Sequence, residues 1–192
     1  NRAVMTVSDI RNAFQTYKRK ELPCTHKRRS AALVPFFMHD EEMYLLFTER
    51  TEMVERHKRE ISFPGGMCEP NDADAVATAL REAHEEIGLP PLSVEVLGMF
   101  DDYTTKTGFC ITPVVGFIQE LPPLAINIQE VAQVLSVPAD VFLADADRET
   151  TFHDSEGNAV QIFYYKYGGY EIWGATAAIA RGIMQHIVLA SS

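Results

Sequence analysis

The sequence is poor in cysteine, and its few cysteines show no functional spacing. Cys24, Cys68 and Cys110 are odd in number and widely separated, and none belongs to a CxxC pair or has a histidine at metal-ligand spacing. A disulfide framework or a zinc site would require one of these patterns. We therefore expect ordinary free thiols and a reducing compartment.

Long apolar runs are also absent. No stretch approaches the roughly 18 to 20 apolar residues that cross a bilayer, and residues 1–14 lack the apolar core of a signal peptide. We expect no membrane partner. We expect an intracellular protein, either cytoplasmic or, if a targeting segment has been removed, mitochondrial or peroxisomal.

The sequence has no excess of positive charge. Its 27 acidic and 17 basic residues give a formal net charge of −10, whereas nucleic-acid binding requires a basic face. We therefore expect no nucleic-acid partner. An anionic small molecule is still compatible with this charge, because bound metal ions reverse the local field.

The order of the predicted elements indicates one mixed α/β domain, which the length of 192 residues suits. The expected elements are a helix that starts at Ser8 as its N-cap and runs to about Leu22, strands at 31–39 and 43–50, strands at 93–105 and 109–118, a short helix from about Ala139, a hairpin within 150–174 that turns at 156–158, and a helix at 175–190.

The stretch 63–89 contains the main candidate functional residues. Asp72 is a suitable N-cap for a helix that runs to about Ile87, and Gly88 is a suitable residue to end it. Residues 51–62, which precede this stretch, show no dominant helical or strand period. A loop followed by an acidic helix is therefore predicted here.

Three glutamates lie on one side of this predicted helix. At about 100° per residue, Glu82, Glu85 and Glu86 fall within an arc of about 100°. Carboxylates so close repel one another, and a divalent metal ion with oxygen ligands would offset the repulsion. The preceding Gly65 and Gly66 allow close backbone approach to a polyphosphate. A solvated helix face is the alternative interpretation.

The spacing of these residues resembles the Nudix box, G-x5-E-x7-R-E-U-x-E-E-x-G-U, where U is aliphatic. The second half matches at 81–89, REAHEEIGL. The first half matches when one extra residue is allowed, which puts Gly66 at the glycine and Asp72 at the first acid, with Glu69 as the competing carboxylate. This expansion is similar to the coenzyme A pyrophosphatase branch of the family.

A second region resembles the upstream signature of that branch, L-L-T-x-R-S-x3-R-x3-G-x3-F-P-G-G. Residues 45–66 match at Arg50 and at the final FPGG. Arg56 follows one position after the expected arginine, and Arg59 replaces the glycine. Further similarity to the branch covers 101–118, 129–138 and 169–183.

The resemblance implies an α/β/α sandwich with a mixed sheet and an N-terminal helical extension, which we divide into residues 1–29 and a Nudix domain at 30–192. It also implies a metal-dependent hydrolase that uses Mg²⁺ or Mn²⁺. Its reaction would be water attack on the diphosphate linkage of a nucleoside diphosphate derivative. Coenzyme A or an acyl-CoA would give adenosine 3′,5′-bisphosphate and (acyl-)phosphopantetheine.

The resemblance also assigns roles to individual residues. The metal ligands would be Glu82, Glu85, Glu86 and Asp72. The catalytic groups would be the same three glutamates with Arg81 and Glu130, one of the four acids acting as base. The substrate-binding residues would be Arg50, Arg56, Arg59, Gly65 and Gly66. Glu130 is otherwise interpreted as a surface residue between a strand and a helix.

Other functions remain open at this point. A diphosphatase for ADP-ribose, NADH or dinucleotides has the same chemistry, and a non-catalytic Nudix-fold nucleotide-binding module belongs to another class. In each case the partner is a small nucleotide, and the protein is expected to be a monomer or a homodimer.

Overall fold

The structure is a computed structural model that describes residues 5–52, 59–153 and 157–191. Its elements in chain order are α1 (Val7–Gln15), β1 (Arg28–His39), β2 (Glu42–Arg50), β3 (Ile61–Ser62), β4 (Gly65–Met67), α2 (Ala75–Ile87), the 3₁₀ helix η1 (Pro91–Ser93), β5 (Glu95–Met99), β6 (Tyr103–Thr104), β7 (Phe109–Ile118), β8 (Val131–Pro138), the 3₁₀ helix η2 (Ala139–Leu143), β9 (Arg148–His153), β10 (Ala159–Tyr167), β11 (Tyr170–Trp173) and α3 (Gly174–Ala190).

The larger sheet is mixed, with β1 at its centre. The main order is β3-β2-β1-β7-β5, and β8, β4 and β6 pair with β2, β1 and β7 respectively. β1 runs antiparallel to β2, which confirms the predicted hairpin, and parallel to β7. The predicted strand at 93–105 forms β5 and β6, and both pair antiparallel with β7. The predicted pairing of this segment with 109–118 is therefore confirmed.

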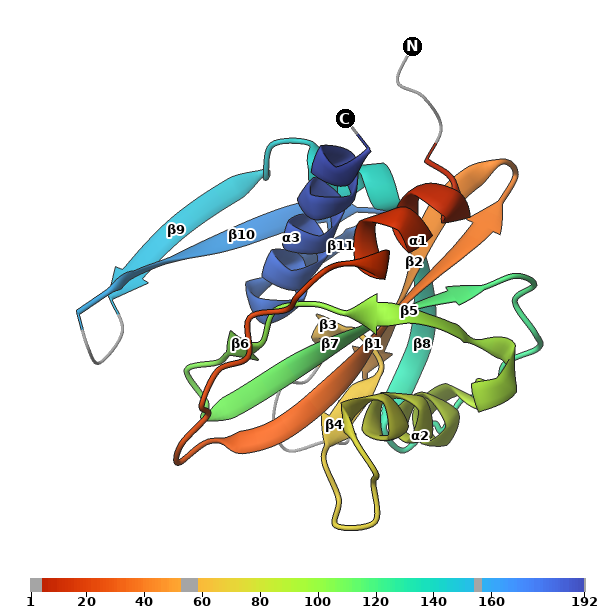
Figure 1. Ribbon diagram of the computed structural model, residues 1–192, viewed down its shortest axis with the longest axis horizontal. Coiled ribbons are helices and arrows are strands. Elements are labelled where there is room, and N and C mark those ends of the chain that lie inside the picture. The colour runs from red at the N-terminus through yellow and green to blue at the C-terminus, as the bar shows by residue number, and fades with distance from the viewer. Residues whose placement is uncertain (1–4, 53–58, 154–156, 192) are drawn as a thin grey trace.

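Helices cover both faces of this sheet, as Figure 1 shows with α2 on one side and α1 and α3 on the other. Because side chains alternate along a strand, β1 serves both layers. Leu33 packs with residues of α2, whereas Val34 and Phe36 pack with residues of α3. The structure therefore confirms the predicted α/β/α sandwich.

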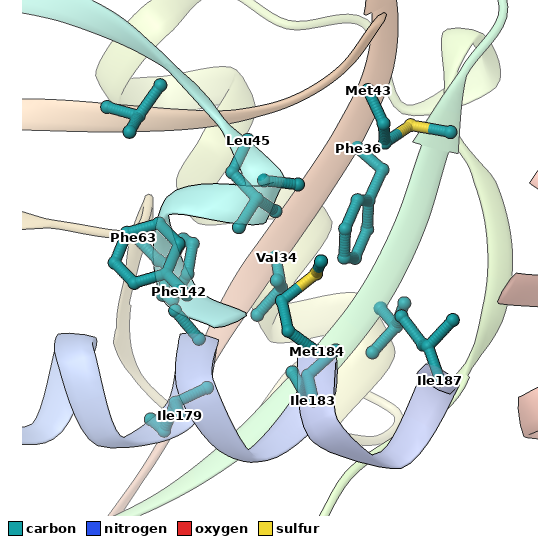
Figure 2. Packing of buried hydrophobic residues seen from close by; sticks show 14 of the residues in the cluster. Val34, Phe36, Met43, Leu45, Phe63, Phe142, Ile179, Ile183, Met184 and Ile187 are labelled. Atoms are coloured by element: carbon teal, nitrogen blue, oxygen red, sulfur yellow. The ribbon is translucent and has the colours of Figure 1, made fainter. Parts of the chain in front are cut away.

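The closing helix α3 follows its predicted stripe. Ile179, Ile183 and Ile187 are all buried, and Figure 2 shows them in the same core cluster as Val34 and Phe36 of the central strand. The helix α1 adds Ile10, Ala13 and Phe14 to this same core. Among the described residues, no helix has the length and apolarity needed to cross a membrane.

The smaller sheet has the order β11-β10-β9 and contains the second predicted hairpin. β9 and β10 pair antiparallel, with Val160 opposite Phe152. Part of the predicted turn, residues 154–156, lies outside the described residues. Tyr165 and Ile172 of this sheet are buried in the core beside α3.

The first helix differs from its prediction at both ends. Its N-cap is Thr6 rather than Ser8, in a capping box with Asp9, and it ends at Gln15. The following residues are instead held by the loop after β5. Asp101 Oδ1 accepts a hydrogen bond from Lys20 N at 2.6 Å, and Asp102 Oδ2 accepts one from Leu22 N at 3.0 Å. These contacts favour an extended segment over a longer helix.

The expectation of three free thiols is wrong for two of them. Cys24 and Cys110 form a disulfide across a sequence separation of 86 residues, and Cys68 is free. The bond joins the segment after α1 to the start of β7. The large separation left no local pattern in the sequence, so only the folded arrangement reveals the pair.

Candidate active site

The helix α2 carries the predicted glutamates and has well-defined ends. Its N-cap is Asp74, whose side chain accepts a hydrogen bond from Ala77 N at 2.8 Å, so the predicted N-cap, Asp72, was wrong by two residues. At the other end, Gly88 adopts a left-handed backbone with φ of 67°, as helix-ending glycines do. The predicted end is confirmed.

The buried face of α2 includes one of the acids. Ala79, Ala83 and Ile87 pack in one core cluster with Leu33 of β1. Glu86 lies on the same side and is only 5% exposed. The helix thus holds one carboxylate in the interior and presents the other two nearer the surface.

Asp72 binds Arg81 in a bidentate ion pair. Arg81 Nε lies 3.0 Å from Asp72 Oδ1, and Arg81 Nη2 lies 3.0 Å from Asp72 Oδ2. Asp72 Oδ2 also accepts hydrogen bonds from Glu69 N at 2.9 Å and Thr78 Oγ1 at 2.8 Å. The hydrogen bonds from Arg81 are the main cause of a lowered pKa of Asp72. Asp72 as a metal ligand stays a prediction.

Arg81 also contacts the exposed end of the glutamate cluster. Its Nη1 lies 3.0 Å from Glu82 Oε1 and 3.2 Å from Glu85 Oε2, and its Nη2 donates to the Met67 carbonyl oxygen at 3.0 Å. Glu69 is a more distant partner at 3.8 Å. The hydrogen bond to Asp72 is the main cause of a raised pKa of Arg81. This one guanidinium therefore links the loop before α2 to the helix.

Glu86 is the most perturbed acid of the site. Burial is the main cause that raises its pKa to about 8, and the charges of Glu82 and Glu130 raise it further. The hydrogen bond from Gly65 N, at 3.3 Å, and the charge of Arg50 act in the opposite direction. The structure therefore brings Glu86 together with residues from three segments outside its own helix.

Glu82 lies beside the glycine turn. Burial raises the pKa of Glu82, and Arg81 opposes this effect. A Cβ atom at Gly66 would collide with the Glu82 carboxylate, and a Cβ atom at Gly65 would collide with the backbone of β1. Gly65 is therefore required for the close packing of the turn against the sheet, whereas a side chain at Gly66 would displace the Glu82 carboxylate.

Arg50 and Glu130 lie next to this cluster. The Arg50 Nε atom is buried and has no hydrogen-bond partner in the described part of the chain. Asn127 Nδ2 donates to Glu130 Oε1 at 2.9 Å, and the Glu130 carbonyl oxygen accepts from Thr51 N at 3.0 Å. The charge of Arg50 lowers the pKa of Glu86 and the charge of Glu130 raises it, so both residues are neighbours of Glu86.

The other predicted arginines lie on the segment after β2. Arg56 falls outside the described residues. Arg59 is described, and its backbone N–H donates to the Arg50 carbonyl oxygen at 3.1 Å. Its side chain contacts Glu49 and Glu52. Glu49 is a buried acid that was not predicted from the sequence. The available signal was its position in β2, in alternation with the apolar Leu45 and Phe47.

The three helix glutamates do not gather at metal-ligand distances in this structure. Within the described ranges, the one group of three ligand atoms all within 4.8 Å of one another comes from Cys24, Asp102 and Cys110. Its cysteines are bonded to each other, and Asp102 accepts from Arg19 and Thr112. That group is therefore a structural junction. The glutamate cluster, with its oxygen donors, has the chemistry to hold a hard cation.

Comparisons with known proteins agree with this fold. A family model described as the NUDIX domain matches residues 26–157. The chain is 34% identical over 187 residues to the uncharacterized Nudix hydrolase NudL of Enterobacter sp. (strain 638), which covers 95% of each chain. It is 37% identical over 166 residues to the NudL of Cronobacter sakazakii (strain ATCC BAA-894), and this alignment covers 84% of each chain.

Solved structures show the same architecture. A NUDIX hydrolase from Alicyclobacillus acidocaldarius superposes with a TM-score of 0.57 at 17% identity, covering 86% of this chain and 96% of that one. A MutT/nudix family protein from Enterococcus faecalis superposes with a TM-score of 0.55 at 16% identity, covering 97% of this chain and 76% of that one. At these identities the structures support the fold alone.

Proposed function

Because this chain belongs to the Nudix family and is a hydrolase of pyrophosphate bonds, we propose that it hydrolyses the diphosphate linkage of coenzyme A or an acyl-CoA. The products are adenosine 3′,5′-bisphosphate and (acyl-)phosphopantetheine. The broader class, nucleoside diphosphate derivatives, follows from the family. The choice of coenzyme A rests on the resemblance of residues 45–66 to the upstream signature of that branch.

The observation that carries the proposal is the buried carboxylate of Glu86. It lies close enough to Glu82 and Glu130 for their charges to raise its pKa, while Arg50 compensates only in part. The ionised form of such a buried carboxyl requires a partner of opposite sign. A divalent cation with a preference for oxygen ligands meets this requirement, so Mg²⁺ or Mn²⁺ fits the donor set.

Glu82, Glu85 and Glu86 are the residues that would hold such a cation. Asp72 accepts four hydrogen bonds, two of them from Arg81, and we assign it to orient that arginine. When bound, the cation neutralises charge on the diphosphate and favours deprotonation of the attacking water.

The chain supplies the remaining chemistry from neighbouring residues. Asn127 orients Glu130 through Oε1, so Oε2 is the oxygen that we assign to accept the proton of the attacking water. Arg50 and Arg59, together with Arg56, bind phosphate oxygens, for which the planar guanidinium is suited. Gly65 and Gly66 lie beside Glu86 and Glu82, and we assign their backbone to contact the diphosphate.

A turnover screen tests the proposal. The purified protein is incubated with Mg²⁺ or Mn²⁺ and with coenzyme A, acetyl-CoA, ADP-ribose, NADH or diadenosine polyphosphates, and the products are separated by chromatography. We expect adenosine 3′,5′-bisphosphate from coenzyme A, complete loss of activity in EDTA, and recovery when metal is restored.

The other outcomes identify the alternatives. Faster hydrolysis of ADP-ribose or NADH would replace coenzyme A with that substrate and keep the reaction class. Tight binding of a nucleotide with no turnover in either metal would identify a binding module and overturn the proposed activity.

A further inference from the structure

The pairing of β2 with β8 contains a β-bulge beside the candidate active site. Glu49 pairs with Gln133, but the next residue of β2, Arg50, pairs with Val131, so Ala132 is an extra residue in β8. The extra residue reverses the alternation of side chains along β8. Val131 packs in the cluster that contains α2, whereas Gln133 contacts Glu49 and the smaller sheet. The bulge therefore shifts the residues before Val131 by one position along β2.

This shift brings Glu130 opposite Thr51, the residue that follows β2. Thr51 N donates a hydrogen bond to the Glu130 carbonyl oxygen at 3.0 Å, and Thr51 Oγ1 donates one to the Gln129 carbonyl oxygen at 3.1 Å. Thr51 is only 6% exposed, and hydrogen bonds shielded from water are the stronger ones. The end of β2 is thus bonded to two successive carbonyl groups of residues 127–130, the turn before β8.

Asn127 fixes the same turn to α2. Its backbone N–H donates to the Glu86 carbonyl oxygen at 2.9 Å. Its carbonyl oxygen accepts from Glu130 N at 3.0 Å and from Val131 N at 2.9 Å. Its side chain accepts from Gln129 N through Oδ1 at 3.2 Å and donates to Glu130 Oε1 through Nδ2 at 2.9 Å. The turn is therefore held by α2 on one side and by the end of β2 on the other.

Glu130 lies near the helix glutamates in this arrangement. Burial is the main cause of the raised pKa values of Glu82 and Glu86, and the charge of Glu130 raises both further. Glu130 itself is exposed, so few neighbours pack around its side chain. The hydrogen bonds of the turn are therefore what determines its position.

We propose that Thr51 is a positioning residue for the reaction, whose hydroxyl holds the turn 127–130 against β2 and so keeps Glu130 beside the glutamates of α2. Because Arg50 directly precedes Thr51, the same link holds the phosphate-binding end of β2 and the base in one unit. This inference rests on the proposed function for the role of Glu130, which accepts the proton of the attacking water.

Two substitutions separate the hydroxyl of Thr51 from its shape. Thr51→Val keeps the branched shape and removes the donor, whereas Thr51→Ser keeps the donor and removes the methyl group. With coenzyme A and Mg²⁺, we expect Thr51→Val to lower kcat about tenfold and to change KM less than about twofold, because a displaced base slows the chemical step and removes no substrate contact. Thr51→Ser should keep kcat within about twofold of the wild type. Equal losses of kcat in both proteins, or a loss confined to KM, would overturn the inference.

Thr48 provides a matched control on the same strand. It is 1% exposed, and its Oγ1 donates to the Ser62 carbonyl oxygen at 3.2 Å. Thr48→Val therefore removes a buried hydrogen bond of the same kind, but one that joins β2 to β3. We expect kcat within about twofold of the wild type. A loss of kcat equal to that of Thr51→Val would overturn the inference.

A double variant tests whether the effect passes through Glu130. In a Glu130→Gln background, Thr51→Val should lower kcat by less than about a further twofold, because the residue that it positions has already lost its function. Independent, additive losses would overturn the inference. Thr51→Ala removes the same donor and replaces Thr51→Val in each comparison if the valine protein does not fold.

Amide hydrogen exchange tests the position of the turn without turnover. In metal-free protein with EDTA, the amides of Glu130 and Val131 report on the turn, because both donate to the Asn127 carbonyl oxygen. They should exchange faster in Thr51→Val than in the wild type or in Thr48→Val. Unchanged exchange in Thr51→Val would overturn the inference.

The outcomes distinguish this inference from the proposed function. Wild-type protein that hydrolyses coenzyme A, with an undiminished kcat in Thr51→Val, would overturn the role of Thr51 and leave the function supported. If the wild type hydrolyses another nucleoside diphosphate derivative faster, the same comparison of kcat is made with that substrate. Wild-type protein that hydrolyses none of them in either metal would overturn both.

Discussion

Replacing Glu86 with glutamine should stabilise the metal-free protein at alkaline pH. Burial raises the pKa of this carboxyl from 4.5 to about 8, so the native state binds a proton more tightly than the unfolded state does. The stabilisation from this proton is fully present below pH 4.5. It is lost as the pH rises from 4.5 to about 8, and it does not change further above that range.

The size of the effect follows from the two pKa values. A difference of about 3.5, at about 1.36 kcal/mol for each pKa unit, corresponds to about 5 kcal/mol of destabilisation above pH 8. Glu86→Gln removes the charge but buries an amide N–H₂ that needs a new acceptor, which costs about 1 to 3 kcal/mol. We therefore expect a net gain of about 2 to 4 kcal/mol at pH 8.5.

Urea unfolding in EDTA at pH 5, 6.5 and 8.5 measures this effect. The wild-type protein should lose stability across this series, and the Glu86→Gln protein should lose much less. Glu69→Gln is the matched control, because Glu69 is an exposed acid of the same region, and its pH profile should follow that of the wild type. A Glu86→Gln profile parallel to the wild type would refute the assignment of Glu86 as a buried, uncompensated acid.

Three further changes have defined outcomes. Gly66→Ala should lower turnover at least tenfold, because the new Cβ displaces the Glu82 carboxylate; unchanged kinetics would contradict this. Asp72→Asn should lower the free energy of unfolding above pH 4, and its difference from the wild type should shrink as the pH falls below the ordinary pKa of 3.8. A difference that stays constant over this pH range would argue against it. Cys24→Ser should lower the free energy of unfolding by up to about 4 kcal/mol in non-reducing buffer, because the bond to Cys110 closes a long loop; no difference between reducing and non-reducing buffers would count against the bond.

Elements with a clear apolar period were predictable from the sequence. The stripe of Ile179, Ile183 and Ile187 predicted the closing helix, and the β-rich runs predicted the β1–β2 hairpin. In these segments local pattern and tertiary packing favour the same structure, so the pattern is sufficient.

The sequence prediction failed where a distant residue competes with the local pattern. The first helix stops at Gln15 because Asp101 and Asp102 bind the backbone beyond it. The N-cap prediction failed for a similar reason. Asp72 and Asp74 are both suitable N-caps, and the choice between them depends on Arg81, which engages the first and leaves the second to cap the helix.

The ion pair with Arg81 also accounts for the unusual first half of the box. The matching position in the Nudix pattern is a glutamate, and Asp72 is shorter by one methylene. The segment between Asp72 and Arg81 is longer by one residue than in the pattern, and hydrogen bonds from Glu69 N and Thr78 Oγ1 fix the aspartate within 3.0 Å of two guanidinium nitrogens. We infer that the expanded spacing preserves contact with the arginine. A carboxylate used to orient Arg81 has only to reach it, whereas a metal ligand would also have to converge with the helix glutamates.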